Sequence, residues 1–295
     1  MKVLVTGAAG RLGSCVCKIL EDQGLPFVAV DRALSEGGTY PVEIADLTDW
    51  QACKKWCEGI DVLIHLANHT NWDSASPEQL YADNTKMNMN LFQAAANNGC
   101  RRVVFSSSVQ VLDGQLPIKD RLKHPLYLPY LPMDSDMPAI PRNSYGLSKQ
   151  AGENALKYFS ETEAMTCVVI RFPLMVDSLI MKTMVENGGM ERGNPYDGFT
   201  YLPFYSGAEA VVLAATVQLD GYHCYFVASK DNLEQRPAID VIAKGLSHLP
   251  CKQSIEVIAS LVDCSIVEEE LGWSQPKSLK ESYEKYHASK EVRPY

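Results

Sequence analysis

Near its start the sequence reads Lys2-Val3-Leu4-Val5-Thr6-Gly7-Ala8-Ala9-Gly10-Arg11-Leu12-Gly13, an apolar run followed by three spaced glycines. The run predicts a buried strand, and the amphipathic pattern over residues 12–23 predicts a helix directly after the turn. In such a turn Gly7 permits the tight bend, Gly10 lets the backbone approach a pyrophosphate, and Gly13 lets the helix pack close to the strand. The helix N-terminus adds free N–H groups and a partial positive charge. The predicted phosphate-binding residues are Gly7, Gly10, Arg11, Leu12 and Gly13.

Short apolar runs alternate with amphipathic stretches through the first half of the chain. The runs predict strands over residues 2–6, 27–31, 62–67, 103–107 and 167–172, and the stretches between them predict helices over 12–23, 49–58 and 81–98. This alternation predicts an α/β fold, a doubly wound parallel Rossmann sheet with a small C-terminal substrate lobe. We expect residues 1–174 to bind the dinucleotide and hold the catalytic residues. Residues 175–295 should form mainly a substrate-binding lobe, interleaved with the first domain.

Composition and charge limit the possible partners. The 295 residues carry a net charge of −9, which argues against nucleic acid or an anionic membrane surface. No apolar run reaches the roughly 18 residues that a membrane span needs, and the N-terminal residues predict a strand instead of a signal peptide. The nine cysteines are scattered, and Cys53 and Cys57 lack a second pair or nearby histidines. We therefore predict reduced thiols, no metal site and a cytoplasmic protein.

The choice of cofactor depends on the end of the second predicted strand. Asp31 follows the glycines by about 20 residues, where an acid accepts the ribose hydroxyls and repels a 2′-phosphate. This favours NAD, although Arg32 could bind a 2′-phosphate and leaves NADP as the less favoured alternative. Two later strand ends lie where ligands bind in such sheets. They add Asp46, Leu47, Leu66, Ala67 and Asn68 to the predicted cofactor-binding residues, with a plain helix cap as the alternative for Asp46.

A tyrosine and a lysine four residues apart dominate the segment Ser144-Tyr145-Gly146-Leu147-Ser148-Lys149. On a helix, Tyr145 and Lys149 lie one turn apart on the same face. A neighbouring ammonium favours the phenolate, which brings the pKa of the tyrosine toward the working range of a general base. The pair follows both the strand–glycine turn–helix opening and a serine-rich strand end, residues 105–108. That combination is far more specific than either part alone.

With these motifs the sequence resembles the extended short-chain dehydrogenase/reductase family, the NAD-dependent epimerase/dehydratase group. The resemblance is clear over residues 1–175 and extends to about residue 280. It is carried by the glycine turn, Asp46-Leu47, His65-Leu66-Ala67, Asn84, Phe105 to Ser108, Tyr145 with Lys149, Arg171 after the sixth strand, Asp263-Cys264-Ser265 and Leu271-Gly272-Trp273.

The resemblance implies a role for each matching residue. Tyr145 is expected to be the acid/base, and Lys149 to bind the nicotinamide ribose and tune Tyr145. Ser108 is expected to hydrogen-bond the substrate oxygen, and Asn84 to support the catalytic geometry, with a plain structural asparagine as the alternative. The predicted cofactor-binding set is completed by Ser106, Tyr145, Lys149, Phe172 and Pro173.

Several segments depart from the pattern of nucleotide-sugar members. Residues 111–114, 172–175 and 201–207 lack the motifs that hold a diphosphate-linked sugar, which weakens the case for a UDP- or GDP-linked substrate. Val109-Gln110 stands where dehydratases have an acidic pair, so dehydration is not expected. The candidate substrate contacts are His69, Asn71, Ser108, Gln110 and Arg236. Solvated loop residues are the alternative for His69 and Asn71, and a surface charge is the alternative for Arg236.

Three functions remain open on these residues. The first is an NAD-dependent oxidoreductase that transfers a hydride to or from a sugar-like or other hydroxyl or carbonyl substrate. The second is an NAD-dependent sugar or nucleotide-sugar epimerase that keeps its cofactor bound. The third is a non-catalytic dinucleotide-binding regulator, which the intact Tyr145 and Lys149 pair disfavours. By analogy with the fold, we expect a homodimer through helices near residues 81–98 and 144–160.

Overall fold

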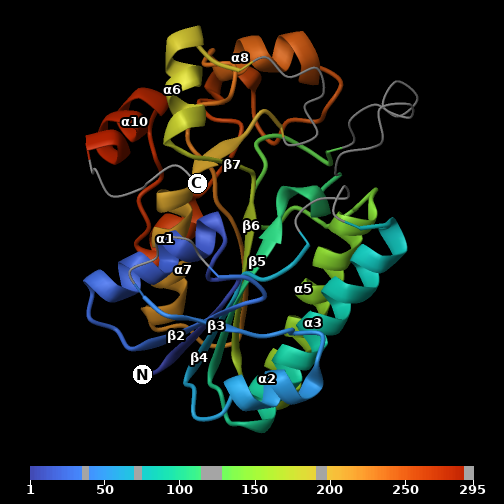
Figure 1. Cartoon of the computed structure of the whole chain (residues 1–295). Helices are drawn as coiled ribbons and strands as arrows, with labels where there is room; N and C mark the ends of the chain where they lie inside the picture. Colours follow the sequence, from blue (N-terminus) through green and yellow to red (C-terminus); the bar gives the residue numbers. More distant parts are fainter. Residues whose placement is uncertain (35–39, 70–74, 114–127, 191–197, 289–295) are drawn as a thin grey trace.

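The computed structural model describes residues 1–34, 40–69, 75–113, 128–190 and 198–288. Its central sheet has seven parallel strands in the order β3-β2-β1-β4-β5-β6-β9 (Figure 1). The strands are β1 (Val3–Thr6), β2 (Phe27–Asp31), β3 (Val42–Ile44), β4 (Val62–His65), β5 (Arg102–Ser108), β6 (Thr166–Phe172) and β9 (Tyr222–Phe226). The predicted fold class is therefore confirmed.

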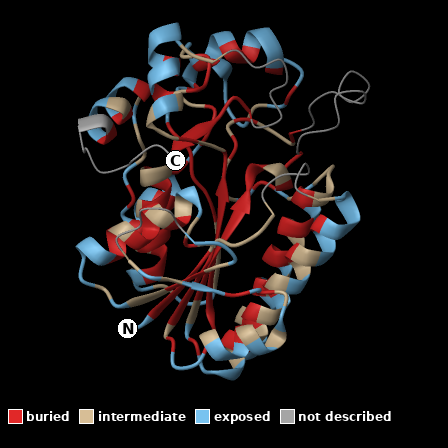
Figure 2. Ribbon diagram, viewed as in Figure 1, coloured by how far each residue is buried: buried red, intermediate tan, exposed pale blue. Residues whose placement is uncertain are grey.

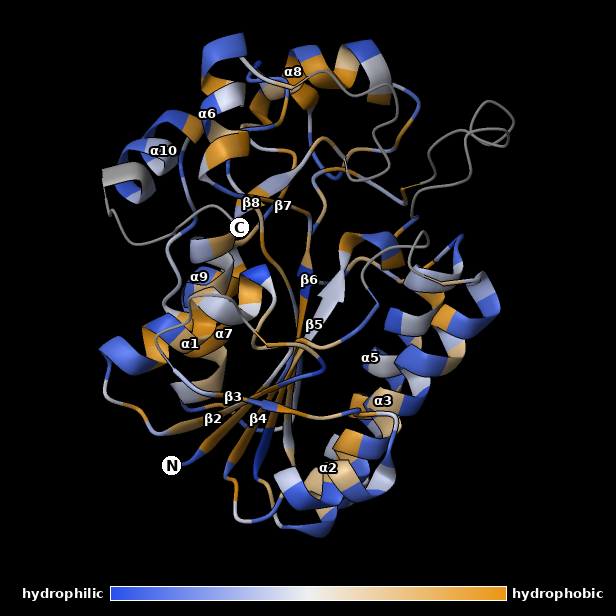
Figure 3. Cartoon of the chain, viewed as in Figure 1, coloured by the Kyte–Doolittle hydropathy of each residue, from blue (hydrophilic) through white to orange (hydrophobic). Residues whose placement is uncertain are grey.

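Helices cover both faces of this sheet. On one face α1 (Arg11–Asp22) packs against α7 (Phe204–Thr216), and on the other α3 (Pro77–Asn97) packs against α2 (Trp50–Trp56) and α5 (Ser144–Glu163) (Figure 1). Strands enclosed in this way are buried on both sides, which is why β1, β4 and β6 are buried throughout (Figure 2). The helices instead mix hydrophilic and hydrophobic residues, as expected for elements with one face in water (Figure 3).

Side-chain caps fix where the site-bearing helices begin. Ser76 accepts a hydrogen bond from the N–H of Gln79 at 3.3 Å, and Pro77 occupies the first turn, so α3 starts four residues before the predicted residue 81. Asn143 accepts from the N–H of Gly146 at 2.7 Å and starts α5 immediately before Tyr145. The tyrosine therefore lies in the first turn of a capped helix, where its backbone is fixed.

The second half of the chain builds a separate lobe and also returns to the central sheet. The lobe contains the two-stranded sheet of β7 (Leu174–Val176) and β8 (Tyr201–Pro203). Its helices are α6 (Ser178–Asn187), α8 (Ala238–Val241) and α10 (Leu279–Ala288), with shorter helical turns at Ile242–Leu246 and Ile255–Val257. α9 (Ser265–Leu271) instead packs against α7 and β9 (Figure 3). Because α7 and β9 also belong to this half, residues beyond 174 complete the sheet as well as the lobe.

Two general features concern the environment of the protein. Within the described ranges, no helix combines the length and the apolar character needed to cross a membrane. All nine cysteines are free thiols, and burial raises the pKa of Cys15 to about 11 and of Cys53 to about 12. High thiol pKa values leave these side chains protonated at neutral pH, so they act as small apolar core residues.

Candidate active site

The glycine turn between β1 and α1 has the shape that a dinucleotide pyrophosphate requires. Gly7 has a φ of +72°, and a Cβ there would lie 2.7 Å from the backbone nitrogen of Ala67. A Cβ at Gly13 would lie 2.0 Å from the carbonyl oxygen of Gly7. The N-cap of α1, Gly10, carries no side chain that could bind the first N–H groups. The backbone alone therefore forms the cradle, and its donors suit an anionic phosphate.

Asp31 at the end of β2 is fastened to this turn. Its Oδ2 accepts a hydrogen bond from the N–H of Ala9 at 3.0 Å, and its Oδ1 accepts from the N–H of Arg32 at 2.7 Å. The carboxylate is thus fixed beside the glycine turn, at the position expected for binding ribose hydroxyls. Arg32 is exposed and lies close enough to Asp46 to lower the pKa of that carboxyl.

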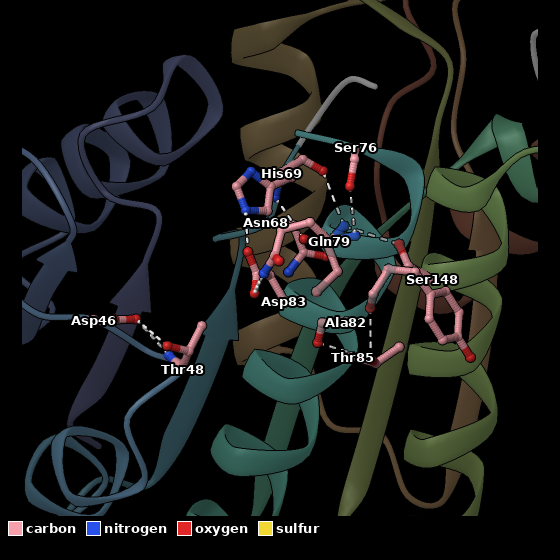
Figure 4. A network of polar contacts seen from close by, with 12 residues as sticks. Asp46, Thr48, Asn68, His69, Ser76, Gln79, Ala82, Asp83, Thr85 and Ser148 are labelled. Atoms are coloured by element: carbon pink, nitrogen blue, oxygen red, sulfur yellow. Dashed lines mark hydrogen bonds and ion pairs between the residues drawn. The ribbon is translucent and has the colours of Figure 1, made fainter. Parts of the chain in front are cut away.

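Asp46 closes a turn of its own. Its Oδ1 accepts hydrogen bonds from the hydroxyl of Thr48 at 2.8 Å and from the N–H of Thr48 at 2.9 Å (Figure 4), and these bonds lower the pKa of Asp46. The cap of α2 is Asp49 and not Asp46. Asp46 is exposed while Leu47 is buried, so the carboxylate of Asp46 lies at the protein surface.

The other predicted cofactor residues lie at strand ends. β4 ends at His65, two residues before the predicted end, so Leu66, Ala67 and Asn68 form the loop that faces Gly7. Phe172 ends β6, and the buried Pro173 follows it. Arg11 extends away from the turn: its guanidinium lies 3.5 Å from Asp177 and 5.9 Å from the ring centroid of Phe204.

The structure brings Ser108, Tyr145 and Lys149 together between β5 and α5. Ser108 lies close enough to Tyr145 to lower the pKa of the phenol, and the Nζ of Lys149 donates to the carbonyl oxygen of Ser106 at 2.7 Å. The turn after β5 is fixed to the start of α5, because Asn143 donates to the Oε1 of Gln110 at 2.9 Å. These contacts set the distance between the serine and the tyrosine.

The pKa values at this site differ from the expectation that Lys149 lowers the pKa of Tyr145. Burial raises the pKa of Tyr145 to about 12, and the hydrogen bond from Ser108 only partly opposes it. Burial also lowers the pKa of Lys149 to about 7, against the attraction of Glu153. The Nζ of Lys149 lies 5.6 Å from the ring centroid of Tyr145, and its hydrogen bond goes to Ser106. Burial therefore controls the pKa of Tyr145, and Lys149 does not bring that pKa toward neutral pH.

Asn84 connects the loop after β4 to the catalytic helix. Its Oδ1 accepts from the N–H of His69 at 2.8 Å, and its Nδ2 donates to the hydroxyl of Ser148 at 3.0 Å. Ser148 in turn donates to the carbonyl oxygen of Tyr145 at 2.7 Å. In Figure 4, His69 points toward Asp83, with 3.1 Å between its Nε2 and the carboxylate. Asn84 is fully buried and holds the site together through these two partners.

The predicted substrate contacts are spread over two parts of the structure. His69 and Gln110 both bond to residues that hold the catalytic helix, Asn84 and Asn143 respectively. Arg236 lies beyond β9, is exposed, and has its Nε 3.9 Å from Glu234, which fits the surface-charge alternative. Asn71 lies outside the described residues.

A buried charged pair beside the site was missed by the sequence prediction. Glu153, one turn after Lys149, accepts from Ser107 and forms a bidentate pair with Arg171. Arg171 lies within β6, inside the strand predicted over residues 167–172. The sequence signal that could have indicated this pair is an acidic residue four positions after Lys149, on the same face of the helix.

Comparisons with known proteins agree with this geometry. The family model of the NAD dependent epimerase/dehydratase family matches residues 3–176, more than half of the chain. GDP-mannose 3,5-epimerase 1 of Oryza sativa subsp. japonica is 27% identical over 183 residues, which cover 58% of this chain and 46% of that protein. Uronate dehydrogenase of Pseudomonas syringae pv. tomato is 26% identical over 202 residues, covering 65% of this chain and 67% of that enzyme. The matched region thus spans only about half of some relatives.

Solved structures share the whole fold. A short-chain dehydrogenase/reductase superfamily protein from Agrobacterium tumefaciens with bound NAD has a TM-score of 0.69, at 20% identity over 99% of both chains. UDP-glucose 4-epimerase from Thermotoga maritima, with UDP-glucose, has a TM-score of 0.70, at 18% identity over 98% of this chain and 99% of the other. These likenesses concern the fold. Together with the family match over the glycine turn and the catalytic segment, they establish that the chain belongs to the NAD-dependent epimerase/dehydratase family.

Proposed function

We propose that the protein is an NAD-dependent oxidoreductase acting on the hydroxyl or carbonyl group of a sugar-like small molecule. The observation that carries this proposal is the meeting of Ser108, Tyr145 and Lys149 at the carboxyl end of β5. The dinucleotide cradle lies at the same edge of the sheet, since the loop after β4 touches Gly7. An acid/base and a cofactor site at one edge are what hydride transfer needs.

The proposed cofactor is NAD, held by residues that the structure supports for this role. The pyrophosphate fits the cradle of Gly7, Gly10 and Gly13, because a Cβ at the first or last of these would collide with backbone atoms. Asp31 is fixed at the turn and would accept the ribose hydroxyls, which disfavours the phosphate of NADP. When bound, NAD supplies the carbon that accepts or returns a hydride. In this proposal residues 1–174 hold the cofactor, and residues 175–295 mainly enclose the substrate.

Each catalytic side chain moves or holds a proton at a defined atom. The phenol of Tyr145 is protonated at neutral pH, as its pKa of about 12 requires, so it can donate to a substrate oxygen during reduction. In the oxidation direction Tyr145 must first release its own proton, and its phenolate then accepts the hydroxyl proton of the substrate. Ser108 favours the phenolate because it lowers the pKa of Tyr145. Ser108 also binds the substrate oxygen. Lys149 holds the nicotinamide ribose and adds positive charge beside the phenol.

Epimerisation is the second candidate, and the comparisons favour it as strongly. Similar proteins include both GDP-mannose 3,5-epimerase and uronate dehydrogenase. An epimerase would use the same three side chains but return the hydride to the opposite face of the sugar. The two functions therefore differ in whether reduced cofactor is released and not in the residues at the site.

A panel of substrates separates these functions. The protein is mixed with NAD and free sugars, uronates, polyols or nucleotide-sugars, and both reduced nicotinamide and sugar isomers are measured. Accumulating reduced nicotinamide that disappears in Tyr145→Phe supports the dehydrogenase, while an altered sugar isomer without net reduction supports the epimerase. If neither appears although NAD binds, the result favours the third function, a non-catalytic dinucleotide-binding regulator.

We further propose that the protein works as a cytoplasmic homodimer. Its free thiols suit a reducing compartment. α3 and α5 pack side by side and expose large apolar residues, with Met89 45%, Leu147 46% and Tyr158 55% accessible. A second copy would cover these side chains. Sedimentation should detect a dimer that Met89→Glu weakens, and a monomer in the unaltered protein would refute this part.

A further inference from the structure

Two neighbouring serines of β5 contact two successive turns of α5. The carbonyl oxygen of Ser106 accepts from the Nζ of Lys149 at 2.7 Å, and the hydroxyl of Ser107 donates to the Oε1 of Glu153 at 2.6 Å. With Tyr145 one turn earlier, the buried face of α5 presents a phenol, an ammonium and a carboxylate in sequence. Glu153 thus belongs to the same row as the proposed catalytic groups, and its carboxylate binds Ser107 and Arg171.

Glu153 is held by a bidentate ion pair. Its Oε1 and Oε2 accept from the Nε and Nη2 of Arg171 at 3.0 and 2.8 Å, and the two side chains are only 5% and 7% exposed. The remaining Nη1 of Arg171 donates to the carbonyl oxygen of Met137 at 2.6 Å. The carboxylate therefore joins α5 to β5 and β6 at one point, in a geometry that planar guanidinium–carboxylate pairs fix strongly.

The contact between α5 and β5 is unusually close at this point. A Cβ at Gly152 would lie 2.7 Å from the ring of Phe105 and 2.8 Å from the Nδ2 of Asn88. The same ring lies under Lys149, with 4.9 Å from its centroid to the Nζ. An ammonium pressed against an aromatic ring in this way is removed from water, so nearby charge acts on it with little screening.

We propose that Glu153 is a positioning residue for Lys149: it pins α5 against β5 and β6 and places there a negative charge that favours the ammonium form of the buried amine. The inference rests on the role proposed above for Lys149. Without a negative group, burial alone would favour the neutral amine, which could neither hold a ribose as a cation nor assist Tyr145. The attraction of Glu153 is the one influence that raises the pKa of Lys149, against the larger lowering by burial.

The other titratable groups around Lys149 cannot replace this charge. On β4, His65 is neutral, because burial lowers its pKa to about 3. On α5, Tyr145 is a neutral phenol at pH 7. On β9, Tyr222 and Cys224 face the ion pair, and burial raises the pKa of Cys224 to about 12. Arg171 on β6 is the other charged group, and it is a cation.

The test measures the protonation of Lys149 itself in the full-length protein. Lysine labelled with ¹³C at Cε is followed by NMR as a function of pH, and the Lys149 signal is assigned by its loss in Lys149→Met. Glu153→Gln should lower the midpoint of the Lys149 titration by about one pH unit or more. Glu153→Asp keeps the charge and should restore most of the midpoint. Glu161→Gln removes an exposed carboxylate from the same helix and should shift it by less than about 0.3 units.

A merely structural Glu153 predicts a different result. The inference is overturned if the Lys149 midpoint in Glu153→Gln stays within about 0.3 units of that of the unaltered protein. Should that variant fail to fold, Glu153→Gln with Arg171→Met leaves no lone buried charge. The repulsion by Arg171 is then lost together with the attraction of Glu153, so a smaller fall of the midpoint, still more than about 0.3 units, is expected. An unchanged midpoint there also overturns the inference.

This experiment needs neither NAD nor a substrate, so its outcome is separate from that of the proposed function. A lowered midpoint in a protein that turns over no substrate would uphold the positioning role and refute the enzyme. An active enzyme with an unchanged midpoint would do the reverse.

Discussion

Lys149 carries a charge in a place where a charge is costly. Its side chain is almost fully buried, and burial lowers its pKa to about 7. The folded protein therefore holds one proton fewer than the unfolded chain between about pH 7 and 10.5. Folding stability should rise with pH across that window, and below pH 7 the full cost of the buried ammonium is present.

The predicted rise of folding stability with pH can be tested by substituting Lys149. Lys149→Met should be more stable than the unaltered protein at pH 6, by a few kcal/mol at most, and the difference should shrink toward pH 10. Lys157→Met, at an exposed position of the same helix, is the matched control and should show no such trend. Denaturant unfolding at several pH values measures both. A difference for Lys149→Met that is the same at every pH would contradict the buried-ammonium account.

Asp31 should decide between the two nicotinamide cofactors. Asp31→Ser removes the carboxylate that accepts ribose hydroxyls and repels a 2′-phosphate, so NAD should bind about tenfold more weakly while NADP binds no worse. Calorimetric titration with each cofactor measures the change. If the unaltered protein already prefers NADP, Arg32 controls the choice instead and the assignment of Asp31 is wrong.

The helix that carries Tyr145 and Lys149 depends on a glycine for its approach to β5. Gly152→Ala would bring a Cβ to 2.7 Å from the ring of Phe105, so α5 must shift or the ring must move. We expect a loss of roughly 1–3 kcal/mol in unfolding free energy and slower turnover. Gly245→Ala is the control, because its Cβ would meet Phe199 at an ordinary 3.6 Å. Equal stability of the two variants would show that the close approach carries no strain.

Local signals explain which elements could be predicted from the sequence. The glycine turn and the Tyr145–Lys149 spacing each occupy only a few residues. The sequence pattern alone therefore predicted the turn before α1 and the pair on α5. The start of α3 was predicted too late because its cap, Ser76, precedes the hydrophobic pattern. The Glu153–Arg171 pair joins a helix to a strand, and the local sequence around either residue does not predict that the two side chains meet.

The pKa of Tyr145 shows a second limit. The sequence places an ammonium one turn away and so predicts a lowered pKa, but it cannot show how deeply both groups are buried. Desolvation is a property of the packed fold, and here it is the largest influence on the pKa of Tyr145, which it raises. Similarly, the sequence left Arg236 open as a substrate contact or a surface charge, because it could not show that the side chain lies beside Glu234.

At the level of the whole molecule, the cofactor site joins parts that are distant in sequence. The loop after β4 lies against the turn at Gly7, and Arg11 reaches Asp177 at the start of α6, in the second half of the chain. A ligand that binds across these parts stabilises only the folded state. NAD at a hundred times its dissociation constant should therefore add about 2.7 kcal/mol to the unfolding free energy.

That stabilisation can be compared between variants. Tyr145→Phe removes only the phenolic oxygen, so this variant should keep nearly all of the stabilisation by NAD. Gly13→Ala would place a Cβ 2.0 Å from the carbonyl oxygen of Gly7, so this variant should lose the stabilisation by NAD. Thermal unfolding with and without NAD gives both values. Retained stabilisation in Gly13→Ala would mean that NAD binds elsewhere.

The central claim is that Tyr145 moves a proton while a hydride passes to or from bound NAD. A single-turnover experiment tests it directly: protein saturated with NAD is mixed with sugar substrates, and reduced nicotinamide is followed by absorbance with time. The account predicts that reduced nicotinamide forms in the unaltered protein and forms at least about a hundredfold more slowly in Tyr145→Phe, although NAD binds both equally. Equal rates in the two proteins, or bound NAD that no sugar reduces, would contradict it.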